Sequence, residues 1–114
     1  MARSLLTTVI AFLLGAGAAF AQHDAALAAR GEKVYAAQKC AVCHSVAGKG
    51  NQKGALDGVG SKLSADEIRM WIVSAPEMAT KTKATRKPLM KAYTTLPKDE
   101  LEALVVYLQS LKKK

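Results

Sequence analysis

The sequence predicts an all-α domain, and three observations support this fold class. Segments 24–39 and 64–74 combine good helix formers with residues that favour helix starts. Segment 97–111 carries apolar residues on one face at helical spacing. No segment alternates between apolar and polar residues in the manner of a half-buried strand. With 114 residues and no internal repeat, the chain is expected to form one folded domain.

Residues 1–21 have the features of a cleaved secretory signal peptide. They begin with Arg3, continue through an apolar stretch and end on Ala19-Phe20-Ala21, which matches an A-x-A cleavage site. The alternative is an uncleaved membrane anchor, but a spanning helix wants roughly 20 strongly apolar residues and this run is shorter. Residues 22–114 are therefore the expected mature domain. Export predicts a bacterial periplasmic protein with no stable membrane insertion after cleavage.

The domain is basic, which bears on its partners. Lys and Arg total 17 against 9 for Asp and Glu, and only Arg3 is lost with the signal peptide. A basic surface favours anionic partners. Export and an aromatic content of 5% argue against nucleic acid. The predicted partner is therefore the acidic face of another protein.

The first half of the domain divides into a helix and a loop. Segment 24–39 is rich in Ala, Lys, Glu and Gln, and Asp24 is a suitable N-cap. Segment 45–63 holds five glycines and no helical or strand period, which predicts a loop.

The second half contains two further predicted helices. Ser64 and Glu67 have the spacing of a capping box, so a helix is expected from there to about Ser74, ended by Pro76. Segment 75–97 is expected to be irregular and basic. The last helix begins near Pro97, and its apolar stripe consists of Leu101, Leu104, Val105, Leu108 and Leu111.

The stretch KCAVCH at 39–44 holds both cysteines of the chain, and four kinds of chemistry use such a cluster. A thioredoxin-like redox pair belongs in a βαβ context, which the pattern lacks. A structural zinc site needs four ligands, and only the distant His23 could join the three side chains here. A disulfide would leave His44 unexplained. Covalent haem attachment has C-x-x-C-H as its local signature.

Helical geometry favours the haem interpretation. Residues at i and i+3 share one face of a helical turn, so Cys40 and Cys43 can both add to the vinyl groups along one haem edge. His44 then projects from the same face toward the iron. A signal peptide and the lack of a third cysteine agree with this assignment.

Most of residues 22–114 resembles the class I c-type cytochromes. The shared features are a first helix with Gly31 and Tyr35 four apart, the C-x-x-C-H motif, a Gly-rich loop, a middle helix, a methionine loop and a last helix ending LVVYLQSLKKK. The resemblance implies a cytochrome c fold of three to five helices around one covalently attached haem c with its iron. It also implies that the last helix crosses the first at Gly31, with Tyr107 packed into the gap.

Two local features depart from the family pattern. The family often has a proline, after the motif, whose carbonyl accepts the hydrogen bond of the ligating histidine, but this chain has alanine around Gly54-Ala55-Leu56. The acceptor for His44 therefore stays open. The usual Met-Pro pair is also absent, because Lys91 follows Met90.

The resemblance implies that the second axial ligand is Met90. Its surroundings, PLMKAYTTL, match the family's M-x-x-aromatic-x-x-L pattern. Met70, inside the middle helix, is expected to pack in the core, whereas Met78 is expected in the irregular loop with freedom to swing toward the iron. For Trp71 two roles can coexist, namely core filling and, by resemblance, packing against the haem.

A thioether opposite an imidazole raises the reduction potential of haem iron and blocks its sixth position, so we expect an electron-transfer protein and not an enzyme. The alternatives are a cytochrome subunit held in a periplasmic oxidoreductase complex and a gas-binding or peroxidatic haem protein, which needs an open iron. Donors would be a dehydrogenase or a quinol-oxidising complex, and acceptors an oxidase or a reductase. Five lysines are candidates to ring the haem edge, unless they serve only solubility: Lys39, Lys53, Lys83, Lys87 and Lys91.

Overall fold

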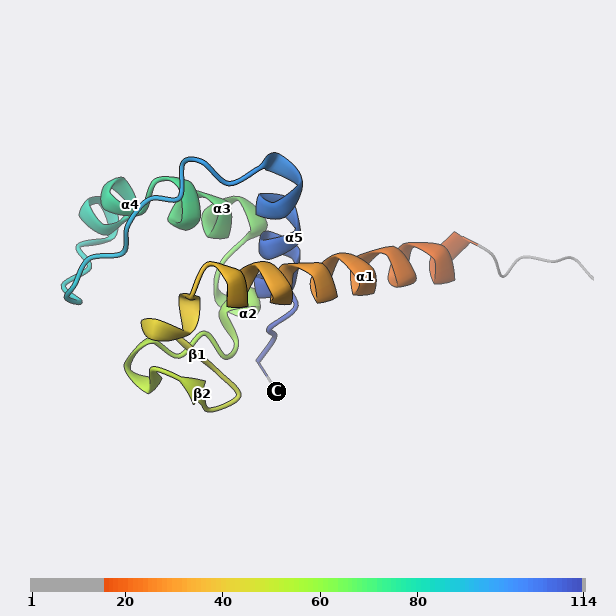
Figure 1. Cartoon of the computed structure of the whole chain (residues 1–114), viewed down its shortest axis with the longest axis horizontal. Coiled ribbons are helices and arrows are strands. Elements are labelled where there is room, and N and C mark those ends of the chain that lie inside the picture. Colours follow the sequence, from red (N-terminus) through yellow and green to blue (C-terminus); the bar gives the residue numbers. More distant parts are fainter. Residues whose placement is uncertain (1–15, 114) are drawn as a thin grey trace, which may run out of the picture.

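The computed structural model describes residues 16–113 and is mostly helical, which confirms the all-α prediction (Figure 1). The predicted signal peptide falls mostly on residues outside this range. The α-helices are α1 (Ala16–Ala37), α2 (Val59–Lys62), α3 (Ala65–Val73), α4 (Ala75–Thr82) and α5 (Lys98–Gln109). Two 3₁₀ turns occupy Cys40–Val42 and Gln52–Gly54. Among the described residues, no helix has the length and apolar character to cross a membrane.

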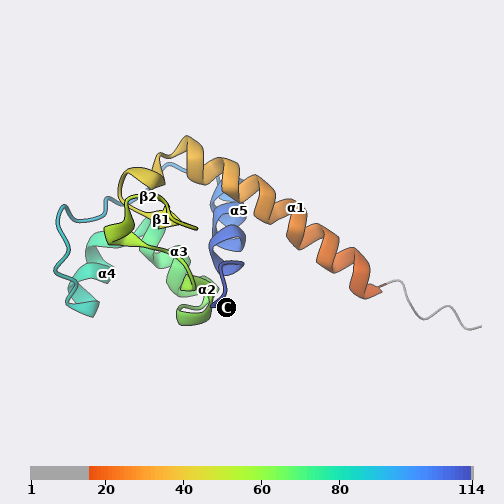
Figure 2. The ribbon, with the colours of Figure 1, turned by 90° about the horizontal axis from the view of Figure 1, so that it is seen from below.

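Helices α1 and α5 cross at a glycine, as the resemblance implied. A Cβ on Gly31 would lie 2.6 Å from Tyr107 Cβ and closer still to the carbonyl oxygen of Ala103. The missing side chain therefore lets the two backbones touch. Beside the crossing, the rings of Tyr35 and Tyr107 meet edge to face with centroids 5.7 Å apart. Figures 1 and 2 both show the N-terminal half of α1 projecting away from the rest of the fold.

The buried core lies where α1, α3 and α5 meet. It consists of Val34, Tyr35, Ile68, Ile72, Leu104, Val105 and Leu108. The predicted apolar stripe supplies three of these residues, and Leu101 and Leu111 are partly buried against them. Leu111 lies just beyond the end of α5 at Gln109, so the last helix is shorter than predicted. Removal of this apolar surface from water stabilises the three-helix arrangement.

The predicted helix start is correct for α3 and wrong for α1. The Ser64 hydroxyl accepts from the Glu67 N–H at 3.1 Å, and the Glu67 carboxylate accepts from the Ser64 N–H at 3.1 Å, so the capping box is confirmed. Asp24 is not an N-cap, because α1 runs through it without interruption. Alanine-rich sequence on both sides of Asp24 sustains the helix there.

Helix α3 ends at Val73, which confirms the predicted end near Ser74. The following segment was wrongly predicted to be irregular throughout, because Pro76 lies in the first turn of α4. Proline is tolerated there because the first N–H groups of a helix have no partner within it. Helix α4 buries Ala75, Met78 and Ala79. From Lys83 to Pro97 the chain is irregular, as expected.

Segment 45–63 is largely the predicted loop, but it contains two short ordered pieces. Strands β1 (Ser45–Val46) and β2 (Lys49–Gly50) form a two-residue antiparallel hairpin whose turn places Gly48 at a φ of 77°. Helix α2 follows Gly58, whose φ of 78° lies in the left-handed region that glycine adopts most easily. The hairpin returns the chain beneath the 3₁₀ turn at Cys40–Val42, since the Asn51 N–H donates to the Ala41 carbonyl at 3.1 Å.

Candidate functional site

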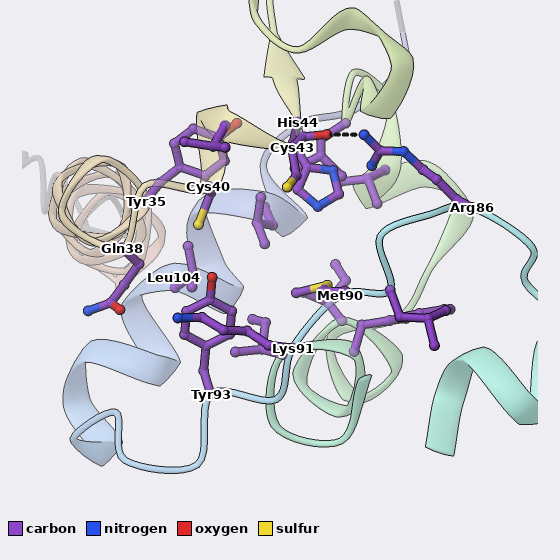
Figure 3. Close-up of a pocket in the computed structure, with 18 of the residues that line it drawn as sticks. Tyr35, Gln38, Cys40, Cys43, His44, Arg86, Met90, Lys91, Tyr93 and Leu104 are labelled. Carbon is purple, nitrogen blue, oxygen red and sulfur yellow. Dashed lines mark hydrogen bonds between the residues drawn. The ribbon is translucent and has the colours of Figure 1, made fainter. Parts of the chain in front are cut away.

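One apolar cavity of about 630 Å³ is lined by all five predicted site residues. Figure 3 labels Cys40, Cys43, His44 and Met90 around it. Cys40, Cys43 and His44 border it on one side, and Trp71 and Met90 also line it. The remaining walls come from the end of α1, from segment 56–63, from α3, α4 and α5, and from the irregular segment before α5. Five of the seven core residues also face this cavity, namely Tyr35, Ile68, Ile72, Leu104 and Leu108.

The two cysteines are presented by a tight turn. The chain enters this turn through Lys39 in the left-handed conformation, with a φ of 57°. The N–H groups of Cys43 and His44 both donate to the Cys40 carbonyl, at 3.1 and 2.9 Å. Both thiols are free and half-buried, and both line the cavity, as the predicted helical turn requires. Burial raises the pKa of the Cys40 thiol, so its neutral form is favoured.

The hydrogen-bond partner of His44, which the sequence did not identify, is a backbone carbonyl. Its Nδ1 lies 2.9 Å from the carbonyl oxygen of Gly54. When Nδ1 carries the proton and donates, the lone pair of Nε2 is free for a metal. Burial lowers the pKa of His44; the Gly54 carbonyl opposes this shift, and the Arg86 charge reinforces it. The imidazole is thus favoured in the neutral form that ligates metals.

The methionines separate clearly in the structure. Met90 is half-buried and, among the three methionines of the described residues, is the one that lines the cavity. Met78 lies in α4 with 8% of its surface exposed, packed away from the cavity, so the expectation of a mobile loop methionine is wrong. Met70 is 44% exposed on α3, and the expectation that it packs in the core is also wrong. Figure 3 shows His44 and Met90 projecting into the cavity from different sides.

Two aromatic residues, Trp71 and Tyr93, line the same cavity as Met90. Trp71 is half-buried, lines the cavity and lies outside the buried core cluster. The Tyr93 N–H donates to the Ile72 carbonyl at 2.8 Å, which ties the segment after Met90 to α3. The Lys91 ammonium lies 4.9 Å from the centroid of the Tyr93 ring, a cation–π distance. The burial of Tyr93 raises the pKa of its phenol.

Sequence reasoning missed Arg86 as a member of this site. Its guanidinium Nη2 donates to the Cys43 carbonyl at 2.6 Å (Figure 3). In the sequence Arg86 is one of several cations in a basic segment, and neither its spacing nor its neighbours distinguish it. What identifies Arg86 is its contact with Cys43, which is distant from it along the chain.

The cavity fits the predicted haem in size and in chemistry. Its volume falls within the range of cofactor pockets, roughly 300–1,000 Å³, and its walls are mainly apolar. The Tyr35 hydroxyl is buried and has no hydrogen-bond partner among the described residues, which leaves a donor for a bound group or a water. The zinc alternative gains no support, since no three His, Cys, Asp or Glu side chains between residues 16 and 113 could hold a metal ion together.

The comparisons with known proteins give one match. No curated protein and no solved structure matches the chain. Residues 28–112 match the family model described as Cytochrome c, which covers well over half of the sequence. The chain therefore belongs to the cytochrome c family.

Proposed function

We propose that this protein is a periplasmic electron carrier whose haem is attached through Cys40 and Cys43 and ligated by His44 and Met90. Family membership gives the coarser statement, namely a haem-binding electron-transfer protein with covalent haem c. The observation that carries the finer proposal is the convergence of these four side chains on one apolar cavity. The predicted signal peptide supports the periplasmic location.

The attachment turn, residues 40–44, supplies three of the four contacts. On attachment, each of these cysteine thiols would add its S–H across a vinyl group of the haem: the sulfur would form a C–S bond and the hydrogen would go to the other vinyl carbon, so no oxidant would be needed. The Gly54 carbonyl oxygen lies 2.9 Å from Nδ1 of His44, and this contact would leave Nε2 free to ligate the haem iron. When bound, the haem iron takes up and releases one electron.

Met90 is the proposed ligand that favours electron transfer over ligand binding at the iron. A thioether ligand stabilises ferrous iron, raises the reduction potential and closes the sixth position to small molecules. The apolar walls act in the same direction, because a medium of low polarity disfavours the extra positive charge of ferric iron. Trp71, at the cavity wall, is proposed to pack against the haem.

The surface around the cavity supports a weak, charge-guided encounter with acidic redox partners. Val42 and Leu89 line the cavity and are 68% and 49% exposed, so each presents apolar surface to solvent beside the cavity. Five exposed lysines are proposed to surround it: Lys39, Lys53, Lys83, Lys87 and Lys91. Such a surface raises association rates with an acidic face without binding it tightly. The proposed donors are a dehydrogenase or a quinol-oxidising complex, and the proposed acceptors an oxidase or a reductase.

Carbon monoxide binding tests the ligand assignment. In holoprotein from a host that attaches haem, the reduced wild type should bind carbon monoxide only slowly, because Met90 would first have to leave the iron. Met90→Ala should bind it much faster than wild type and should show a lower reduction potential. Met78→Ala is the matched control, since it removes the same side chain from a buried position away from the cavity. Gas binding by Met78→Ala and not by Met90→Ala would contradict the proposal.

A further inference from the structure

We propose that Arg86 is a positioning residue whose side chain holds the segment bearing Met90 against the attachment turn. The inference rests on the proposed function, since it takes His44 and Met90 as the axial ligands. In the described part of the chain, the hydrogen bond of Arg86 goes to the Cys43 carbonyl and not to either ligand side chain. It would act by fixing the distance between the two parts of the chain that carry them.

The first observation is a charged hydrogen bond between these two parts. Arg86 lies four residues before Met90, and its Nη2 donates to the carbonyl oxygen of Cys43 at 2.6 Å. Cys43 belongs to the attachment turn and directly precedes His44. A hydrogen bond from a guanidinium is stronger and more directional than one between neutral groups. Figure 3 shows the Arg86 side chain reaching across to the turn from the segment that leads to Met90.

The second observation is the space that Gly54 leaves for this contact. A Cβ on Gly54 would lie 2.9 Å from the Cζ carbon of Arg86, and closer still to the guanidinium Nη1 and the Cys43 carbonyl oxygen. A side chain at position 54 would therefore displace either the guanidinium or the carbonyl. The same Gly54 supplies the carbonyl that accepts from His44. Arg86 thus covers the residue that orients the first axial ligand.

The third observation is how sparsely the Met90 segment is attached elsewhere. The Ala84 N–H donates to the Ala79 carbonyl at 2.9 Å, and the Tyr93 N–H donates to the Ile72 carbonyl at 2.8 Å. Residues 85–92 lie between these two points. In the described part of the chain, the bond from Arg86 is the only hydrogen bond between this segment and the other residues. Loss of this bond would leave Met90 free to move over a larger range.

Two substitutions test the inference by the rate at which reduced holoprotein binds carbon monoxide. Arg86→Gln should bind it about 10-fold faster than wild type, because binding requires Met90 to leave; this factor corresponds to about 1.4 kcal/mol. A modest effect is expected since the side chain is solvent-exposed. The reduction potential should also fall, because an open iron and the loss of a nearby cation both favour the ferric state. Arg86→Lys should give a smaller change in the same direction, since one ammonium cannot reproduce the guanidinium's contacts.

Two control variants separate positioning from charge and from general stability. Lys81→Gln removes an exposed cation from α4, just before the same segment. Glu102→Gln breaks the ion pair with Arg69, at 2.8 Å, which lies away from the cavity. Neither should change the carbon monoxide rate, although the second should lower the stability of the fold.

The outcomes distinguish this inference from the ligand assignment. Arg86→Gln binding carbon monoxide at the rate of Lys81→Gln overturns the inference while Met90→Ala still supports the ligand. If Arg86→Gln yields no holoprotein, Arg86→Lys decides the matter, and a rate equal to that of Lys81→Gln overturns the inference. A reduced wild type that binds the gas as fast as Met90→Ala contradicts the ligand assignment, and the inference then fails with it.

Discussion

Gly31→Ala should destabilise the fold, although alanine is the better helix former. The added Cβ would meet Tyr107 Cβ at 2.6 Å, against an ordinary carbon–carbon contact of about 3.5–4.0 Å. It would also press on the Ala103 carbonyl oxygen, which belongs to the backbone of α5 and cannot rotate away. The two helices would therefore have to separate by about 1 Å at their crossing.

The expected net cost follows from two opposing effects. Overpacking of a closed interface typically costs 1–3 kcal/mol and occasionally more. Because the added Cβ meets backbone atoms, we expect its cost to lie at the upper end, about 3–4 kcal/mol. Replacement of a helical glycine by alanine returns about 1 kcal/mol. The net loss is therefore about 2–3 kcal/mol. With a urea slope of about 2 kcal/mol per M, the unfolding midpoint should fall by about 1–1.5 M.

Urea unfolding of the holoprotein measures this shift, and Ala29→Gly is the control on the exposed side of the same helix. That reverse substitution should cost about 1 kcal/mol through helix propensity alone. If Gly31→Ala unfolds at the same urea concentration as wild type or higher, the close helix crossing does not constrain position 31 and the reasoning is wrong.

Three further predictions concern charge and processing. The hydrogen bond from Arg69 holds the pKa of Glu102 below its usual range, so the stabilisation from this pair is present above the unfolded pKa of about 4.3 and is lost as pH falls through the lower folded value. Because the pair is partly exposed, Glu102→Gln should cost under about 1 kcal/mol at pH 7 and nothing at pH 2 in thermal unfolding, whereas an equal loss at both pH values would exclude this titration. Reversal of Lys87 and Lys91 to Glu should slow electron exchange with an acidic partner, in stopped-flow at low salt, several-fold more than reversal of Lys62 and Lys98, and equal effects would mean that net charge alone matters. Mass spectrometry of the exported holoprotein should give Gln22 as the first residue; a retained N-terminus would contradict the predicted signal peptide.

Local signals in the sequence predicted much of the fold and the attachment turn. The capping box at Ser64 and the apolar stripe of α5 depend on residues within one or two helical turns, so they can be recognised without tertiary information. The same holds for the turn at Cys40–Val42, where the spacing of three already places both thiols together. These features were predicted correctly because their causes lie close together in the chain.

Features that depend on tertiary contacts were not predictable in this way. Pro76 is compatible with either the end of one helix or the start of the next, and only the packing of α4 decides between them. That packing buries Met78, whereas the Met70 side chain on α3 is 44% exposed. The Gly54 carbonyl contacts His44 and the Arg86 guanidinium contacts Cys43, and both contacts join residues that are distant in sequence, so no local pattern predicts them.

The sharing of residues between the core and the cavity has a consequence for how the protein is made. Of the seven buried core residues, all except Val34 and Val105 also line the cavity. A chain without its cofactor would therefore leave one side of its core in contact with water and lose much of the driving force for folding. Attachment should then come before folding, on a chain that is still extended. Because Cys40, Cys43 and His44 lie within five successive residues, the attachment apparatus can recognise them before any helix has packed.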